Sequence, residues 1–476
     1  MRILFSVLFL VLAFGSISQL VHPANTPAFK QDEVAKIYIT MNSQDFNTMV
    51  GDSLGSTYEF PASFIYISST LSDTLTSIGI RLRGNTSLQS AKKSFKLDFN
   101  SYVPGQKWKD LKSMNLNGEH NDVSIMRART CHEMLRWAAC PVARSSYIEL
   151  YINGTYKGLY LNVEHFDDQF LEARFIGDAS GNLYKAGYGA DLTNLGSNPN
   201  SYVPLYELKT NEDLNDYSGL IHFIEVLNNT SNAEFPCAIQ EVLDVDLCLK
   251  TMALEVLAAH WDGYIGNKNN FYLYQRPSDS KFVFIEYDLD NTFGVDWFSI
   301  NWQTRNIYTW ASSNTQRPLY NRLMQVPYFK DRFSYYIDLH CQQFFNPTFL
   351  LSVWSQTQDI IAPSALADTY KGLDYGFTNS DFMSAITQDW GSHIPVSLSE
   401  HVTLRRSSAL SQSSYLGLTN PCSLSLTESI DLDIPIPVSV SYYDVLGRVL
   451  PEPPANQVYL VRYSDGSTRQ FYSVEP

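Results

Sequence analysis

Residues 260–294 read HWDGYIGNKNNFYLYQRPSDSKFVFIEYDLDNTFG, and the rest of the chain is interpreted around them. The preceding run DVDLCLKTMALEVLAAH is apolar and begins at Asp244, which predicts a helix with an N-terminal cap. Within residues 260–294, FYLY and KFVFIEY have the aromatic and β-branched composition of strands. The stretch therefore predicts a helix followed by two strands, the second of which ends in acidic residues.

Three carboxylates mark the end of that second strand. Because side chains alternate along a strand, we expect Glu286, Asp288 and Asp290 on one side, together with Phe282 and Phe284. Two carboxylates about 5 Å apart repel by roughly 3 kcal/mol at an effective dielectric of about 20. A cation, a base or open water would relieve this repulsion, and oxygen-only ligands suit a hard ion such as Mg²⁺.

The spacing of polar residues in the same stretch matches a kinase pattern. His260, Asp262 and Asn267 reproduce H-R-D-x-x-x-x-N, with Trp in place of Arg. The acidic strand end before Asn-Thr-Phe-Gly occupies the place of D-F-G. In phosphoryl transfer the first Asp accepts the hydroxyl proton, and the Asn and the second Asp hold metal on the phosphates. The alternative is a set of acidic residues that cap turns at strand ends.

Length and composition limit the class of protein. With 476 residues, 44% of them hydrophobic, the chain can build two or three folded domains. The formal net charge of −15 argues against nucleic acid or an anionic membrane as the main partner. It is compatible with an exported protein that binds divalent cations.

The N-terminus has the pattern of an export signal. Arg2 precedes an apolar run from Ile3 to Phe14, and small residues follow at Gly15 and Ser16. The run is shorter than the roughly 20 residues of a membrane span. We expect a signal peptide at residues 1–24 and a secreted or cell-surface protein.

Six cysteines permit up to three disulfides in an exported chain. Cys131–Cys140 and Cys237–Cys248 are the expected local pairs, and buried free thiols are the alternative. No C-x-x-C pair occurs, so a thiolate zinc site is not expected.

After the predicted signal peptide, four segments have the composition of β-strands: AKIYITM, YEFPASFIYIS, SIGIRLRGNTS and KKSFKLDF. Alternation in IGIRLR places Arg81 and Arg83 on one face and apolar side chains on the other. With Lys93 and Lys96 of the next strand, the polar face is either an anion-binding surface or a solvated strand face.

A helix, SIMRARTCHEMLRWAA, and a hairpin follow. Asn153-Gly154 is a tight-turn dipeptide between two alternating runs, and Glu164 ends the second of them. The later segment GNLYK predicts a short strand that presents Lys185. Kinases use a strand lysine, paired with a glutamate, to bind nucleotide phosphates. We therefore take Glu164 as the partner of Lys185.

The ordered motifs RGNTS…KKSFKLDF, Met126-Arg127, YIELYINGTYKGLYLNVE, GNLYK and NFYLY…FIEYDLDNTFG resemble the spore-coat CotH family of atypical protein kinases. The resemblance covers roughly residues 35 to 400, and we expect a CotH kinase-like domain at residues 35–414. It implies an α+β, atypical two-lobed protein-kinase-like fold. It also implies that ATP and Mg²⁺ or Mn²⁺ are used to phosphorylate Ser or Thr residues of a protein.

The resemblance also implies roles for individual residues. Lys185 matches the nucleotide-binding lysine, Asp262 the catalytic aspartate and Asp288 the metal-binding aspartate. Either Asn267 or Asn270 is the metal-binding asparagine: Asn267 fits kinase spacing, whereas Asn270 directly precedes the aromatic strand.

Three further residues complete the expected site. Asp290 is a further metal ligand candidate beside Asp288. Arg83 and Arg127 match family motif positions, and we place Arg83 with Lys185 and Glu164 at the nucleotide.

The last residues change character. VSVSYYDVLGRVL, NQVYLVRYSDG and STRQFYSVEP predict short strands of a small C-terminal β-sandwich-like module at residues 422–476. YDVLGR followed by VYLVRYSDG resembles the C-terminal sorting domain of the type IX secretion system of Bacteroidetes, although a Pro-Asn-Pro opening and a basic final motif are missing. An Ig-like partner-binding module is the alternative.

Two classes of function agree with these features. The first is a secreted, metal-dependent Ser/Thr kinase with Asp262 as the base. The second is a non-catalytic surface adhesin or structural protein that keeps the kinase-like shape and binds a cell-surface or host protein. Transfer of AMP instead of phosphate is a third possibility, since it needs the same triphosphate and metal.

Overall fold

The computed structural model describes residues 20–25, 27–52, 55–311, 315–422, 440–444, 448–450, 458–463 and 468–472. Most of the predicted signal peptide therefore lies outside the described residues. Its end does not, because Leu20 forms a bridge to Phe175 and the Val21 amide donates to the Arg174 carbonyl at 2.9 Å. Among the described helices, none combines the length and the apolar character that crossing a bilayer requires.

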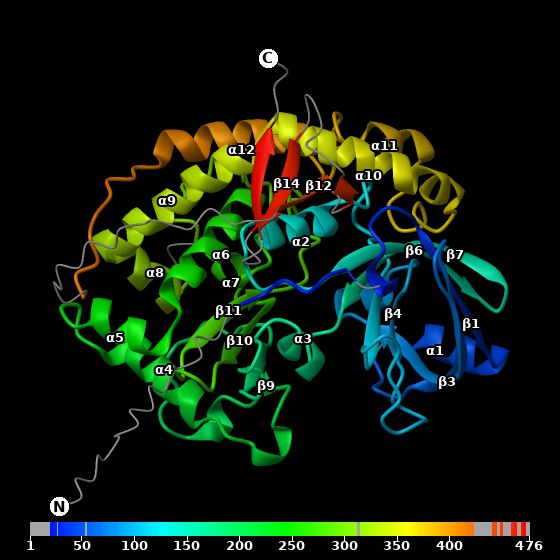
Figure 1. Cartoon of the computed structure of the whole chain (residues 1–476), viewed down its shortest axis with the longest axis horizontal. Helices are drawn as coiled ribbons and strands as arrows, with labels where there is room; N and C mark the ends of the chain where they lie inside the picture. The colour runs from blue at the N-terminus through cyan, green and yellow to red at the C-terminus, as the bar shows by residue number, and fades with distance from the viewer. Residues whose placement is uncertain are drawn as a thin grey trace, which may run out of the picture.

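Seven strands near the N-terminus close into a barrel in the order β1-β2-β3-β4-β5-β7-β6. Neighbouring strands are antiparallel except β1 and β6, which are parallel. Figure 1 shows the barrel at one side of the molecule, with helix α1 (Ser43–Gly51) beside it. The strands are β1 (Ala35–Met41), β2 (Phe60–Ile67), β3 (Ser72–Arg83), β4 (Ser94–Asp98), β5 (Ser113–Asn117), β6 (Ser145–Ile152) and β7 (Thr155–Glu164).

Alternating side chains fill the barrel as the sequence predicts. At the end of β3, Ile80 and Leu82 are buried, whereas Arg81 and Arg83 are partly exposed. Trp108 packs against three aromatic rings inside the barrel, with ring centroids 4.8 to 5.9 Å apart. The barrel therefore has a hydrophobic core of its own.

The second core lies in a larger body of helices around a sheet of order β11-β10-β8-β9. Figure 1 shows this body on the other side of the molecule, with α2 between it and the barrel. The sheet contains β8 (Leu183–Ala186), β9 (Tyr206–Leu208), β10 (Phe271–Gln275) and β11 (Phe282–Glu286). The helices are α2 (Arg127–Trp137), α3 (Asp168–Glu172), α4 (Ser218–Asn229), α5 (Phe235–Val242), α6 (Val245–Ala258), α7 (Tyr264–Asn267), α8 (Pro318–Gln325), α9 (Pro327–Gln343), α10 (Pro347–Ala367), α11 (Asn379–Ser384) and α12 (Leu398–Gln412). Helices and sheets confirm the α+β class.

Helix α6 positions residues 260–294, which contain the acidic loops. Asp244 caps it, as predicted, by accepting a hydrogen bond from the Leu247 amide at 3.2 Å. Most of its side chains are buried, and it ends at Ala259, whose φ of 55° is left-handed. The chain therefore leaves the core at His260 and enters the acidic segment.

The C-terminal strands form one antiparallel sheet of order β13-β12-β14-β15. The described strands make this one sheet, and most other residues of the predicted sandwich-like module at residues 422–476 lie outside the part of the chain that the structure describes. The strands are β12 (Val440–Asp444), β13 (Val449–Leu450), β14 (Val458–Tyr463) and β15 (Thr468–Tyr472).

The predicted cysteine pairs are wrong. Cys237 of α5 is bonded to Cys422, with the two Cα atoms 5.4 Å apart. Cys131, Cys140 and Cys248 are buried free thiols, as is Cys341. Pairing by short sequence spacing fails here because these four thiols are buried in the core as free groups. Cys131, for example, contacts the Thr292 hydroxyl at 3.4 Å.

Candidate functional site

Two loops of the acidic segment lie side by side because of the β10–β11 register. Phe271 pairs with Glu286, so the residue before β10 meets the residue after β11. The Tyr287 amide donates to the Asn270 carbonyl at 3.1 Å. The loop that carries Asp262 and the loop that carries Asp288 are therefore neighbours at one end of the sheet.

The three carboxylates of the second strand do not share a face, so that expectation is wrong. Strand β11 ends at Glu286, and Asp288 has a left-handed φ of 59°, which breaks the alternation. Glu286 is buried, Asp288 is exposed and Asp290 is partly buried. Only the two aspartates belong to the open site.

Glu286 instead forms a buried pair with Glu255 beneath the Asp262 loop. Glu255 also accepts a hydrogen bond from the Ile265 amide at 2.8 Å. Burial raises the pKa of Glu255 to about 7, and burial together with Glu255 raises the pKa of Glu286 well above its usual range. The pair therefore holds a proton at neutral pH and supports the loop from within the core.

Asp262 is partly buried and is held by two amides. Asn267 Nδ2 donates to Asp262 Oδ1 at 2.5 Å, and Asn270 Nδ2 donates to Asp262 Oδ2 at 3.0 Å. Burial, followed by the charge of Asp288, raises the pKa of Asp262 to about 6, although the amides oppose the rise. The structure thus brings both candidate asparagines to the same carboxylate.

Asp290 extends this acidic cluster. Burial, then the charges of Asp288 and Asp262, raises its pKa well above the usual range. Asn291 Nδ2 donates to Asp290 Oδ1 at 2.9 Å. No Lys or Arg within the described ranges forms an ion pair with these three aspartates.

Basic residues face the carboxylates from the other side. Lys185 lies in β8 opposite Tyr272, and its Nζ is 5.4 Å from the centre of the Tyr287 ring. Burial and then the charges of Lys209 and Arg83 lower the pKa of Lys185, whereas Asp288 raises it. Arg83 reaches this region from the end of β3. Lys185 therefore lies over the Tyr287 ring, where the charges of both Arg83 and Asp288 affect it.

Glu164 is not the partner of Lys185, which corrects the prediction. Its buried carboxylate is bound by Arg144 at 2.6 Å and by Arg174 at 2.5 Å. These two guanidinium groups keep the pKa of Glu164 below its usual value despite burial. Glu164 ends β7 on the side of the barrel that faces α3, so it anchors that contact instead of the site.

The oxygen donors of the acidic loops fit a hard divalent cation. In the parts of the chain that the structure describes, no three His, Cys, Asp or Glu side chains alone form a metal-binding group. The donors here are instead a mixture of aspartates and asparagine amides, which is what Mg²⁺ uses when phosphates and water supply the remaining ligands. The exposed Asp288 is open to such a ligand.

A groove of about 1180 Å³ borders the basic side of the site. It is lined by β4 and β5 of the barrel, by α3 and by the turns around β8 and β9, including Lys96, His165 and Lys209. His165 has a strongly lowered pKa because it is buried among Lys96, Arg83, Lys209 and Lys185. The three aspartates, Lys185 and Arg83 do not line this groove, which is linked to the basic side of the site through His165.

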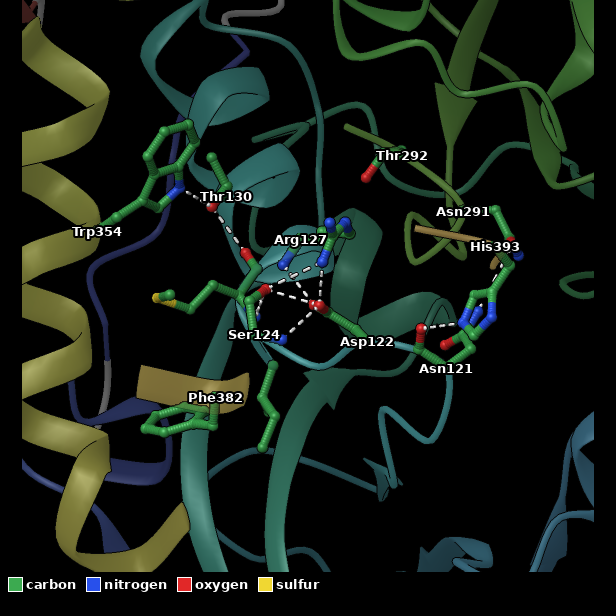
Figure 2. A network of polar contacts seen from close by, with 12 residues as sticks. Asn121, Asp122, Ser124, Arg127, Thr130, Asn291, Thr292, Trp354, Phe382 and His393 are labelled. Atoms are coloured by element: carbon green, nitrogen blue, oxygen red, sulfur yellow. Dashed lines mark hydrogen bonds and ion pairs between the residues drawn. The ribbon is translucent and has the colours of Figure 1, made fainter. Parts of the chain in front are cut away.

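A polar network at the start of α2 holds the segment that faces the acidic loops (Figure 2). Asp122 accepts hydrogen bonds from the Ser124 hydroxyl at 2.6 Å, from the Arg127 amide at 2.9 Å and from the Arg127 guanidinium. Both charged side chains are fully buried. Arg127, a family motif residue without an expected role, therefore fixes the loop before α2.

Sequence reasoning missed two residues of that loop. Glu119 is buried, and Asp290 is the charge that raises its pKa most after burial itself. Asn121 is also buried, and its carbonyl accepts from His393 at 3.0 Å. No sequence pattern marked them, because their neighbours in the fold are far away along the chain.

Comparisons with known proteins confirm the resemblance to the CotH family. The family model described as CotH kinase protein matches residues 80–408, more than half of the chain. The chain is 24% identical to Inner spore coat protein H of Bacillus subtilis, over 62% of this chain and 80% of that protein. It is also 24% identical to Spore coat protein homolog 1 of Rhizopus delemar, over 71% of this chain and 56% of that protein.

Two further similarities have limited reach. Invasin CotH2 of Rhizopus delemar is 24% identical over 54% of this chain and 46% of that protein, so the chain spans only about half of these fungal relatives. Among solved structures, the Shewanella oneidensis complex of HipA, HipB and operator DNA matches with a TM-score of 0.23 and 9% identity, covering 80% of this chain and 71% of that chain. At that TM-score the likeness does not establish a shared fold.

Proposed function

Because this chain belongs to the CotH kinase protein family, we propose that it is an ATP-dependent kinase that uses Mg²⁺ or Mn²⁺ and phosphorylates Ser or Thr side chains of a protein. The observation that carries the proposal is the position of Asp262. It is held by two asparagine amides and is affected by the charge of Asp288, which also acts on Lys185, the neighbour of Arg83.

Asp262 is the proposed acceptor of the substrate hydroxyl proton. A carboxyl with a pKa of about 6 is mostly ionised at neutral pH, yet it is more basic than an ordinary aspartate. Asn267 and Asn270 fix its orientation by donating to both of its oxygens. Orientation of the attacking hydroxyl is the main task of this residue in phosphoryl transfer.

Asp288 and Asp290 are the proposed ligands of the cation, with an asparagine oxygen turned toward it after reorientation of the amide. A bound Mg²⁺ would neutralise phosphate charge in the transition state. Lys185 and Arg83 are the proposed contacts to the phosphates, and the groove lined by His165, a residue that the charges of both cations affect, is the proposed seat of the nucleoside. In this proposal the barrel and the helical body are the two lobes of a kinase-like domain at residues 35–414.

We also propose that the protein acts outside the cell or on its surface. The names of the spore-coat and invasin relatives support this, as does the Cys237–Cys422 disulfide, since disulfides persist mainly in oxidising compartments. The C-terminal sheet, at residues 422–476, would then be a secretion or sorting module.

One observation favours a second function. Invasin CotH2 carries a name that indicates attachment to or entry into cells, so a surface adhesin that binds a cell-surface or host protein is the competing proposal. An adhesin of this kind has no need for Asp262 as an ionised acceptor.

Phosphate transfer by the purified chain tests the proposal. We expect incorporation of the γ-phosphate of ATP into the chain itself or into an added Ser- and Thr-containing protein when Mg²⁺ or Mn²⁺ is present. Asp262→Ala should abolish it, whereas Asp359→Ala, an exposed change in α10, should not. Mass spectrometry of the product separates a phosphoryl group from an adenylyl group, and full transfer by Asp262→Ala would contradict the proposal.

A further inference from the structure

The loop between β5 and α2 places a buried carboxylate opposite the acidic site. Glu119 has a side chain only 6% exposed, and its Oε2 has no hydrogen-bond partner among the described residues. The charges that raise its pKa most after burial are carboxylates, with Asp290 first and then Asp122 and Asp288. The nearby Lys92 does not neutralise it, because Lys92 is bound to another acid, Asp368, at 2.7 Å.

Asn121 repeats this pattern on the same loop. The residue is 4% exposed, and its Oδ1 is buried without a partner among the described residues. Its Nδ2 is directed toward Asn291, whose own Nδ2 donates to Asp290 at 2.9 Å, and Figure 2 shows Asn121 and Asn291 near each other. The Asn121 side chain is also a hydrogen-bond partner of Asp290 and lowers its pKa, so the amide lies at Asp290 with its nitrogen toward the carboxylate. Two buried oxygen atoms without donors among the described residues therefore lie on one loop beside Asp290.

The backbone holds Glu119 in a strained conformation. Its φ of 50° is left-handed, which is unfavourable for a residue with a long side chain. The Gly118 amide donates to the Ser94 hydroxyl at 2.9 Å, and the Asp122 amide donates to the Glu119 carbonyl at 3.2 Å, so the turn is fixed on both sides. Strain that the surroundings enforce is concentrated at functional sites and at ligand contacts.

We propose that Glu119 and Asn121 are ligands of a divalent cation that they share with Asp290, with the Asn121 amide turned so that its oxygen instead of its nitrogen faces the cation. The set of two carboxylates and one amide oxygen suits Mg²⁺ or Mn²⁺, and the cation would satisfy both unpartnered oxygens and remove the repulsion between Glu119 and Asp290. This inference rests on the proposed kinase function and adds to it a metal ligand from the barrel side of the site.

The proposal has a structural consequence beyond metal binding. Glu119 follows the last barrel strand before α2, whereas Asp290 follows β11 in the helical body. A cation held by both joins the barrel to the sheet that carries Lys185. Metal binding should therefore strengthen the contact between the two hydrophobic cores.

The test measures Mn²⁺ binding to the full chain by calorimetry, with a non-hydrolysable ATP analogue present. We expect Glu119→Gln to weaken Mn²⁺ binding by about tenfold or more, since even outer-shell changes weaken metal sites by about 10- to 100-fold. Asn121→Ala should weaken it as well. Glu149→Gln is the matched control, because Glu149 is a barrel carboxylate that pairs with Lys36 away from the acidic loops.

The number of protons released on Mn²⁺ binding provides a second measurement. Carboxylate ligands release protons when a metal binds, so titration in two buffers of different ionisation heat should give fewer released protons for Glu119→Gln than for the wild type. If Glu119→Gln and Asn121→Ala bind Mn²⁺ like the wild type while Asp288→Ala does not, the inference is overturned and the kinase proposal stands. If the wild type shows no Mn²⁺ binding that depends on nucleotide, both are overturned. A Glu119→Gln variant that is merely more stable without metal, with unchanged Mn²⁺ affinity, would mean that Glu119 is a protonated structural residue.

Discussion

Asp262→Asn should stabilise the metal-free protein while removing its proposed catalytic group. Burial and Asp288 raise the pKa of Asp262 from 3.8 to about 6. That rise corresponds to about 3 kcal/mol of unfavourable ionisation in the folded state at neutral pH. A neutral amide of the same shape has no charge to bury, so the variant avoids this unfavourable free energy.

The net gain is smaller, for two structural reasons. Asp262 is partly exposed, so solvent screens part of the unfavourable charge. Its two oxygens accept hydrogen bonds from Asn267 and Asn270, and an amide has only one oxygen, so one hydrogen bond worth about 1 kcal/mol is lost. We expect a net stabilisation of about 1 kcal/mol.

The pH dependence identifies the cause. Because the folded state binds the Asp262 proton more tightly than the unfolded state, the unfavourable term grows as the pH rises from about 4 to about 6 and is constant above that range. Urea unfolding in the presence of a chelator should therefore show Asp262→Asn more stable than the wild type at about pH 7.5, and this advantage should disappear at about pH 4.

Asp359→Asn is the control, since this aspartate is exposed on α10 and its replacement should change little. An Asp262→Asn variant that is less stable than the wild type by the same amount at both pH values would refute the reasoning. It would mean that the hydrogen bonds of Asp262 outweigh its burial.

Three further outcomes follow from the same contacts. Asp368→Ala leaves Lys92 buried without its 2.7 Å ion pair, so unfolding measurements should show a loss of about 3–5 kcal/mol, whereas Asp359→Ala should show almost none. Cys422→Ser opens a disulfide whose cysteines are 185 residues apart, so the free energy of unfolding should fall by up to about 5 kcal/mol if the disulfide acts through chain entropy, and the melting temperature should fall with it. Reductant should lower the melting temperature of the wild type to that of the variant and leave the variant unchanged. Phosphate transfer should lose rate as the pH falls through about 6, because Asp262 then gains a proton; a rate that is flat down to about pH 4 would exclude Asp262 as the ionised acceptor.

Local patterns predicted the elements that carry the site. The cap at Asp244, the turn at Asn153-Gly154 and the strand of Lys185 follow from short-range rules on hydrogen bonding, turn geometry and alternation, and the structure contains each of them. These features depend on residues that are near in sequence, which is why a single sequence reveals them.

Other features depend on contacts that no local pattern encodes. The left-handed backbone at Asp288 separates Glu286 from the open site, and alternation cannot anticipate it. Glu164 forms ion pairs with Arg144 and Arg174 instead of Lys185, and these partners come from segments that its own sequence neighbourhood does not indicate. Cys237 is bonded to Cys422 because the segment after α12 returns to α5. In the same place Asn420 Nδ2 donates a hydrogen bond to Gln240 Oε1 at 2.7 Å.

The most direct test of the kinase proposal is thermal unfolding with ATP and Mg²⁺ or Mn²⁺, for the wild type and for Asp288→Ala. At 100 times the dissociation constant, a ligand adds about 2.7 kcal/mol of stability to the folded state. We predict that the wild type is stabilised only when nucleotide and metal are present together, and that Asp288→Ala loses this stabilisation. Absence of any shift in the wild type, or an equal shift in Asp288→Ala, would contradict the proposed nucleotide and metal site.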